Sequence, residues 1–193
     1  MSSLKERLDL LEADLKSNPV RISVHTELPF AIFRYDPDRE WELRDQVKLL
    51  GARLAASGKT VQHISLADLL WEAIDASEGL DAIVELERDY GFEAAQQQVT
   101  VYLSDPTWHP LADALVARLE LLDPSHHVAF LVRASAMTPG IYHMSRLFEE
   151  MQGKTGIPTV LFYPGTLEGI TGLQFMGLKE REALGNYRVK IYG

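Results

Sequence analysis

Two Gly-Lys-Thr triplets come closest to a known chemical motif in this sequence. They begin at Gly58 and Gly153 and match the last three positions of a phosphate-binding loop. That loop needs a further glycine five residues earlier, where this chain has Arg53 and Phe148. Both triplets also follow an expected helix and precede an expected strand, whereas a phosphate-binding loop precedes its helix. We interpret each glycine as a helix C-cap, so the fold is expected to lack a phosphate-binding loop.

Three acidic residues follow the first expected strand. Asp36, Asp38 and Glu40 could bind a metal ion or act as an acid/base pair. Acidic side chains in the first turn of a helix also stabilise that helix through its dipole. Because Pro37 follows Asp36, the pair has the form of an N-cap with proline at the first helical position. We favour the capping interpretation.

Charged and aromatic residues lie at the carboxyl ends of several expected strands, where open α/β sheets bind ligands and partners. Arg34 and Arg133 each end a buried strand, so each charge needs a partner. They either pair with acids of the same rim or line a site for an anion or a protein partner. Tyr163 either binds or donates a proton there, or simply bonds the backbone. The full candidate set for ligand or partner binding is Arg34, Asp36, Arg44, Arg133, Tyr163 and Gly165.

Other catalytic and metal-binding patterns are missing from the sequence. There is no cysteine, which excludes thiol nucleophiles, disulfides and thiolate metal sites. There is no Gly-x-Ser-x-Gly elbow either. The six histidines lack metal-ligand spacing, and the adjacent His126 and His127 point to opposite faces of an extended chain. We expect no catalytic residue, no metal and no cofactor.

The elements that position these residues are organised around 157–166, Ile-Pro-Thr-Val-Leu-Phe-Tyr-Pro-Gly-Thr. Its four consecutive apolar or aromatic residues predict a strand buried on both faces, as in the middle of a parallel sheet. Pro164-Gly165 ends that strand. Further strands are expected at 30–35, 59–64, 128–132, 173–176 and 187–192.

Helical patterns separate the expected strands. The leucine stripe of 1–17 predicts an N-terminal amphipathic helix. Thr138-Pro139 is expected to cap a helix, and 92–105 fits either a helix or a strand, with helix favoured. The alternation predicts an α/β fold: a three-layer sandwich in which helices cover both faces of a mostly parallel sheet. We expect a single domain, 1–193, with a helical insertion at 66–124.

The segment 75–93 carries most of the net charge. It has seven acidic residues and one basic residue, a charge of −6 out of the chain's −9. Leu80, Ile83, Val84 and Tyr90 are expected to give it a buried side, which predicts one helix with a strongly acidic face. The residues expected to form an acidic face for a partner are Glu78, Asp81, Glu85, Glu87 and Asp89.

Composition narrows the class of function. The chain has 28 acidic and 19 basic residues and no Lys/Arg run, which disfavours direct binding to a nucleic acid. No apolar run approaches the roughly 18 residues needed to span a bilayer. The charged, periodic N-terminus is unlike a signal peptide, and the lack of cysteine fits a cytoplasmic location.

The strand at 160–166, Val-Leu-Phe-Tyr-Pro-Gly-Thr, resembles the BrxB family, a small protein of BREX bacteriophage-defence systems. Supporting similarities are spread along most of the chain, at 29–37, 43–44, 128–133, 138–139, 147–153 and 187–188. The sequence departs from the family at 133–137, where a glycine-containing apolar turn is more usual.

The resemblance implies a cytoplasmic bacterial component of a multi-protein complex that methylates host DNA and blocks phage replication. The methyltransferase, the ATPase and the alkaline-phosphatase-like protein PglZ are separate chains, and the family supplies no catalytic residues to carry across. Our first hypothesis is a non-enzymatic adaptor that binds another defence protein, with PglZ the first candidate. The alternative is a small-molecule or nucleotide binder, or a degenerate enzyme, that uses the strand-end rim of Arg34, Arg133 and Tyr163. The oligomeric state is left open.

Overall fold

The sheet at the centre of the protein is mostly parallel. The computed structural model describes residues 3–23, 28–168, 172–178 and 189–193. Within these ranges the strands are β1 (Phe30–Tyr35), β2 (Thr60–Ser65), β3 (His127–Val132), β4 (Thr159–Glu168), β5 (Gly172–Phe175) and β6 (Lys190–Tyr192). Five of them run parallel in the order β2-β3-β4-β1-β6, while β5 pairs antiparallel with β4. Residues 187 and 188, expected in the last strand, lie outside the described ranges.

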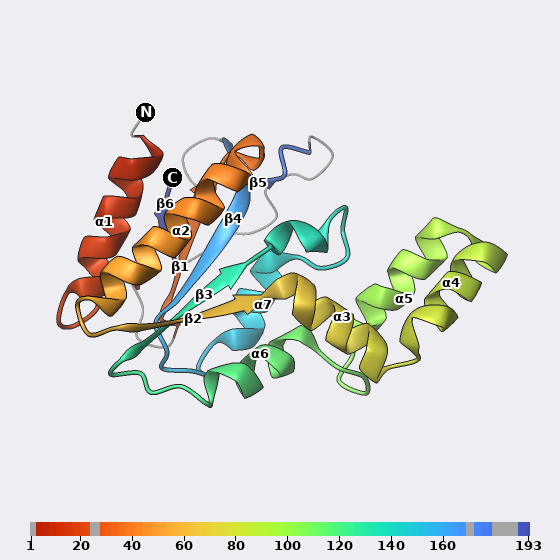
Figure 1. The fold of residues 1–193 in the computed structure, drawn as a ribbon. Coiled ribbons are helices and arrows are strands. Elements are labelled where there is room, and N and C mark those ends of the chain that lie inside the picture. Colours follow the sequence, from red (N-terminus) through yellow and green to blue (C-terminus); the bar gives the residue numbers. More distant parts are fainter. Residues whose placement is uncertain (1–2, 24–27, 169–171, 179–188) are drawn as a thin grey trace.

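Helices cover both faces of this sheet. They are α1 (Leu4–Lys16), α2 (Glu40–Ala55), α3 (Leu66–Ala76), α4 (Gly79–Tyr90), α5 (Phe92–Ser104), α6 (Leu111–Leu119) and α7 (Met144–Met151). In Figure 1, α1 and α2 lie over one face and α6 and α7 over the other, while α4 and α5 extend beyond the sheet. The predicted α/β class is confirmed: a single domain with a mostly parallel sheet between two helical layers.

The strand predicted to be central is central. Val160, Leu161, Phe162 and Tyr163 are all buried, and β4 pairs with β1 on one side and β3 on the other. Successive side chains alternate between the faces. Phe162 joins Phe33 and the leucines of α1 and α2 in one hydrophobic core. Leu161 and Tyr163 join α3, α5, α6 and α7 in the other core.

Both Gly-Lys-Thr glycines lie just past the end of a helix. Gly58 follows α2 with φ +84°, and Gly153 follows α7 with φ +72°. That left-handed conformation is the one a helix C-terminus commonly adopts, and glycine reaches it without steric cost. Ser65 caps α3, since its hydroxyl oxygen accepts a bond from the main-chain N–H of Asp68 at 3.2 Å.

The predicted starts of two helices are corrected. Asp36 does act as a cap with Pro37 at the first position, but of a 3₁₀ turn (Pro37–Arg39), and α2 begins only at Glu40. Thr138-Pro139 does not cap a helix. Thr138 is extended and instead ends a 3₁₀ turn (Ala134–Met137), because a residue before proline disfavours the helical conformation. Helix α7 therefore begins at Met144.

The acidic segment 75–93 is not one helix with one buried side. Helix α3 ends at Ala76, and α4 runs between Gly79 and Gly91, which have φ +82° and +89°. The region that could have been helix or strand is helix α5. Helices α3 to α6 fill the crossover between neighbouring strands β2 and β3, over the range where the insertion 66–124 is expected. In the described ranges, no helix is both long and apolar enough to cross a membrane.

Candidate functional site

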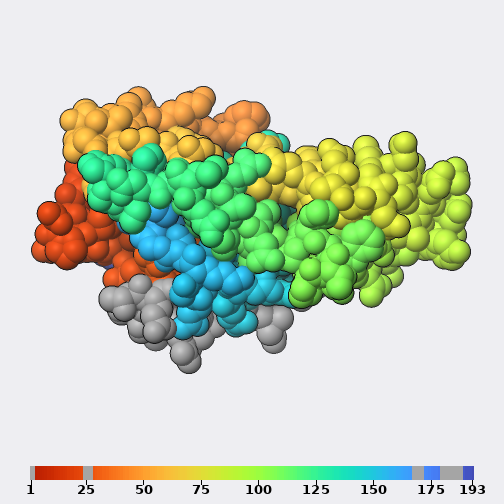
Figure 2. Space-filling model, turned by 90° about the horizontal axis from the view of Figure 1, so that it is seen from below, coloured from red at the N-terminus to blue at the C-terminus, as the bar shows by residue number. Residues whose placement is uncertain are grey.

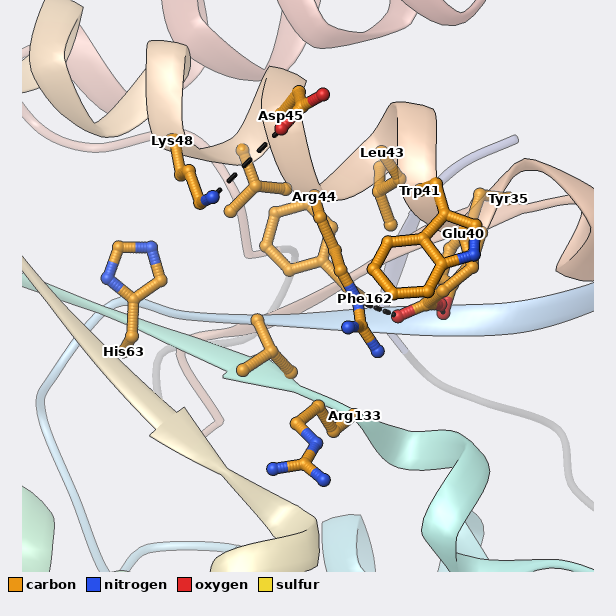
Figure 3. A pocket seen from close by; sticks show the side chains of 12 residues that line it. Tyr35, Glu40, Trp41, Leu43, Arg44, Asp45, Lys48, His63, Arg133 and Phe162 are labelled. Carbon is orange, nitrogen blue, oxygen red and sulfur yellow. Dashed lines mark hydrogen bonds and ion pairs between the residues drawn. The ribbon is translucent and has the colours of Figure 1, made fainter.

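A hollow of about 370 Å³ opens between α2 and the sheet (Figure 3). We call it the strand-end hollow, because Tyr35 and Val132 are the last residues of β1 and β3. Its full lining is Tyr35, Glu40, Trp41, Leu43, Arg44, Asp45, Val47, Lys48, His63, Val132, Arg133 and Phe162. Its volume falls within the range of small-molecule sites.

The connections of the sheet explain why the hollow lies there. The helix after β1, α2, packs on the face that carries Phe33 and Phe162, whereas the helix after β3, α7, packs on the opposite face. Chain segments that leave neighbouring parts of a parallel sheet in opposite directions open a crevice at the carboxyl ends of the strands. The outer strand β2 keeps His63 exposed on the α2 side.

Arg44 lies on the α2 wall of the hollow. Its Nε donates to Oε1 of Glu40 at 2.8 Å, and its guanidinium lies over the indole of Trp41, 4.7 Å from the ring centroid. Glu40 also accepts the hydroxyl hydrogen of Tyr35. Burial, and then the charge and bond of Glu40, raise the pKa of Tyr35, so this phenol stays protonated.

Arg133 lies on the other side of the hollow, directly after β3. Figure 3 shows the Arg44 guanidinium extending from α2 toward the sheet, while the Arg133 guanidinium lies past the end of β3 and points away from that of Arg44. Arg133 has φ 60° and ψ 37°, a left-handed conformation that is uncommon for a residue with a side chain. Its Nη1 lies 3.1 Å from Oδ1 of Asp68.

Two further ionisable residues complete the hollow. Lys48 lies one turn beyond Arg44, with its Nζ 4.0 Å from Oδ1 of Asp45. The ring of His63 meets the ring of Phe130 edge-on, with centroids 5.7 Å apart. Partial burial lowers the pKa of His63, so the ring is neutral at pH 7.

The other residues expected to bind a ligand or partner, Arg34, Asp36, Tyr163 and Gly165, do not line the hollow. Arg34 is buried and donates from Nη1 to the carbonyl oxygen of Gly165 at 3.3 Å. Gly165 is needed because a Cβ there would lie 2.3 Å from the carbonyl oxygen of Gln174. Tyr163 is buried in the core of the opposite face, where its ring packs against Phe175 at 5.1 Å. Asp36 is exposed in its cap.

Of the six candidates, the hollow therefore contains two, Arg44 and Arg133, while Arg34 and Gly165 contact each other elsewhere. Trp41 and Lys48 were missed, although the spacing of Trp41, Arg44 and Lys48 at i, i+3 and i+7 places them on one face of a helix. His63 could not be found from the sequence, because its exposure depends on which part of the sheet α2 leaves uncovered. In the described residues, no three His, Asp or Glu side chains converge as a metal site requires.

A second candidate site is the hairpin of α4 and α5, which we call the acidic hairpin (79–104). Figure 2 shows it projecting beyond the body of the protein. All five residues of the expected acidic face are exposed on α4 or at its start: Glu78, Asp81, Glu85, Glu87 and Asp89. Glu78 accepts the hydroxyl hydrogen of Tyr102 at 2.5 Å and so joins the two helices. Burial and this bond raise the pKa of Tyr102 to about 12.

The acidic hairpin also exposes large apolar side chains, which corrects the expected buried side. Only Ile83 is buried, whereas Leu80, Val84 and Tyr90 are 45%, 53% and 76% exposed. Phe92, at the start of α5, is 57% exposed. Because the hairpin extends past the sheet, α4 packs against α5 and α3 and leaves these residues uncovered. Leu80 and Val84 are one turn apart on the same helix surface.

Comparison with known proteins identifies the family. Residues 62–191 match the family described as BREX protein BrxB. The chain belongs to the BrxB family. The family match begins within β2 and includes the acidic hairpin and Arg133, but not the α2 wall of the hollow. The resemblance at 160–166 is thereby confirmed.

One BrxB-family relative covers almost the whole chain. "BREX protein BrxB" from Bacillus cereus (strain H3081.97) is 22% identical over an alignment of 190 residues that covers 93% of this chain and 94% of the relative. No solved structure matches. Family membership makes this chain a component of a BREX system, and BREX implies phage defence.

Proposed function

We propose that this BrxB-family protein is a non-enzymatic adaptor of the bacterial cytoplasm that binds another BREX protein through its acidic hairpin. The observation that carries the proposal is the projection of α4 and α5 from the body with charged and apolar side chains exposed together. The resemblance implies that methylation, ATP hydrolysis and phosphatase-like chemistry belong to other chains, which leaves assembly as a role for this one.

The charges of the hairpin support a basic partner. Asp81, Glu85 and Asp89 recur at i, i+4 and i+8, so they follow one side of α4. Arg88 pairs with Asp89 at 3.1 Å on the exposed surface. An extended acidic face accelerates association with a basic surface and makes binding sensitive to salt.

The apolar side chains of the hairpin support a partner with a hydrophobic patch inside its basic surface. Leu80 and Val84 lie on the flank of α4, and Tyr90 and Phe92 adjoin the turn at Gly91. Aromatic residues are enriched among the residues that dominate binding energy at protein interfaces. Large exposed apolar patches that are rimmed by polar or charged residues often mark sites of protein–protein interaction.

The test is affinity capture of the tagged chain, co-expressed with the neighbouring BREX proteins at low and high salt. PglZ is the partner to be examined first. We expect a stoichiometric complex that weakens as salt rises. The triple charge reversal Glu85→Lys, Glu87→Lys and Asp89→Lys is expected to abolish capture while the circular dichroism spectrum is retained.

A matched control variant distinguishes the effect of the hairpin charges from the effect of the net charge of the protein. Asp9→Lys, Glu120→Lys and Glu149→Lys change the net charge by the same amount at exposed positions away from the hairpin. This control variant is expected to capture its partner like the wild type. Capture that survives the hairpin reversal, or that fails equally in both variants, contradicts the proposal.

A further inference from the structure

We propose that the strand-end hollow binds a small organic phosphate with a flat apolar part, the chemical class of a 5′-mononucleotide. This site is separate from the acidic hairpin and does not depend on the adaptor role. Four observations carry the proposal: the three cations of the lining, the apolar floor, the backbone of Arg133 and the place of the hollow in the fold.

The cations of the hollow are arranged for an anion. Arg44 and Arg133 come from different elements, α2 and the turn after β3, and both line the hollow. A phosphate in the hollow can accept N–H bonds from Arg44, and from Arg133 once its guanidinium turns from Asp68 toward the hollow. With Lys48, three cations and only two carboxylates, Glu40 and Asp45, line the hollow of a protein whose net charge is −9.

The present ion pairs of these cations do not prevent such binding. Arg44 pairs with Glu40, and Arg133 pairs with Asp68, which lies outside the lining. The Arg133 and Asp68 side chains are 50% and 62% exposed, so solvent screens their pairing and little is lost when a phosphate competes for the guanidinium.

The remaining surface of the hollow is apolar and aromatic. Phe162 and Val132 form its floor, and Leu43 and Val47 project from α2 above them. Trp41 is 76% exposed at the side of the hollow and already stacks with Arg44. A flat ring system can pack on such a surface while its phosphate meets the guanidinium groups. The volume of about 370 Å³ suits a mononucleotide.

The backbone of Arg133 is held in an unfavourable conformation. Left-handed φ at a residue other than glycine persists only where the surroundings fix it, and such residues cluster at binding and catalytic sites. Here the conformation turns the chain from β3 into the following 3₁₀ turn and places Arg133 at the rim of the hollow. Glycine would meet the backbone requirement better but would supply no charge.

The binding test uses the full chain and four probes, AMP, GMP, CMP and UMP, with adenosine and inorganic phosphate as partial probes. Isothermal titration calorimetry and thermal unfolding are the measurements. At least one mononucleotide is expected to bind and raise the melting temperature. The corresponding nucleoside and free phosphate are each expected to bind at least tenfold more weakly.

Three variants assign binding to the hollow. Arg44→Ala and Arg133→Gly are each expected to weaken mononucleotide binding at least tenfold. Arg118→Ala, which removes an arginine from an exposed pair with Glu72, is the control and is expected to bind like the wild type. Arg133→Gly removes the guanidinium while suiting the left-handed backbone, so a loss of binding there is not a loss of folding.

Several outcomes overturn the proposal. It fails if none of the four mononucleotides binds, or if both hollow variants bind as tightly as the wild type. Adenosine binding as tightly as AMP excludes a role for the guanidinium groups, and phosphate alone binding as tightly excludes the apolar floor. The hairpin charge reversal should retain mononucleotide binding, and Arg133→Gly should retain partner capture, so the two sites fail independently.

Discussion

Arg7 of α1 donates from Nη1 to the main-chain carbonyl oxygen of Arg34, the penultimate residue of β1, at 2.6 Å. Both arginines are buried, and the Arg7 guanidinium also lies 5.3 Å from the centroid of the Phe33 ring. Burial and the nearby charge of Arg34 lower the pKa of Arg7. Because the ordinary pKa of arginine is far above 7, Arg7 still keeps its charge at neutral pH. This contact fixes the N-terminal helix to the end of the strand that leads into the α2 wall of the hollow.

Arg7→Ala is therefore expected to destabilise the protein by about 2 kcal/mol, the usual worth of a buried hydrogen bond from a charged donor. Urea unfolding followed by circular dichroism measures the change. Lys5→Ala, at an exposed position of the same helix, is the control and should change stability by no more than about 0.5 kcal/mol. Equal effects of the two variants would show that the Arg7 contact does not stabilise the fold.

At Arg133, glycine is expected to be more stable than alanine. Both substitutions remove the guanidinium and its pair with Asp68, so their difference isolates the backbone. A left-handed conformation costs a residue with a Cβ roughly 1–2 kcal/mol, and the greater freedom of glycine in the unfolded chain offsets part of this. We expect Arg133→Gly to exceed Arg133→Ala by about 1 kcal/mol in unfolding free energy. The opposite order would mean that the left-handed backbone is not retained.

Gly165→Ala is expected to destabilise the antiparallel pairing of β4 with β5. The added Cβ would lie 2.3 Å from the carbonyl oxygen of Gln174 and 2.7 Å from the Tyr163 ring, closer than atoms can approach. Forced overpacking of this kind costs about 1–3 kcal/mol. Gly156→Ala is the control, since its nearest neighbour, Pro124, would be 4.0 Å away. Thermal unfolding of the two variants compares them directly.

Asp14 should make stability depend on pH. Burial raises its pKa, but the bonds from Lys190 at 2.5 Å and Tyr192 at 2.7 Å outweigh this and lower the pKa overall. A carboxyl whose pKa is lower in the folded state stabilises the protein above its unfolded pKa of about 3.9, and that stabilisation is lost as the pH falls through the folded value.

Asp14→Asn is consequently expected to cost about 2 kcal/mol at pH 7 and progressively less below about pH 4. Urea unfolding at a series of pH values measures the difference from the wild type. Asp9→Asn, exposed on the same helix, is the control. A difference between Asp14→Asn and the wild type that stays constant from pH 7 to pH 3 would exclude the ionised carboxylate as the source.

Leu80→Ser together with Val84→Ser is expected to weaken partner capture while leaving the unfolding free energy within about 1 kcal/mol of the wild type. The reason is that both side chains are half exposed and contribute little to the core. Ile83→Ala on the same helix is the contrasting variant, because Ile83 is buried and its truncation should destabilise by about 2 kcal/mol. Unchanged capture by the double variant would remove the apolar residues from the adaptor proposal.

The central strands could be predicted from the sequence because they contain runs of apolar residues. Val160 to Tyr163 and 128–131 are buried, and strands buried on both faces leave such a local signal in the sequence. The cap at Ser65 and the glycines after α2 and α7 are likewise local, since each depends on a few neighbouring residues.

The sites could not be predicted to the same degree because they depend on how elements pack. An apolar face on α4 shows that burial is possible, but only the tertiary structure shows that nothing in the described protein covers Leu80 and Val84. Arg34 and Tyr163 were expected at strand ends like Arg133, yet both lie inside their strands, β1 and β4, and are buried there. The hollow exists because α2 and α7 pack on opposite faces of the sheet. The residues of a short segment cannot predict on which face a helix packs.

The position of β4 in the sheet sets the order in which the protein can fold. β4 lies between β1 and β3, so that Phe30 pairs with Thr159 across most of the chain. The first strand must therefore remain unpaired with β4 while six α-helices and two further strands are synthesised. Such distant pairing makes folding slow and leaves the apolar faces of β1 and β3 exposed to chaperones during translation. Once β4 is synthesised, it can pair with β3 on one side and β1 on the other and so join the two parts of the sheet. The complete sheet therefore forms late and in one step.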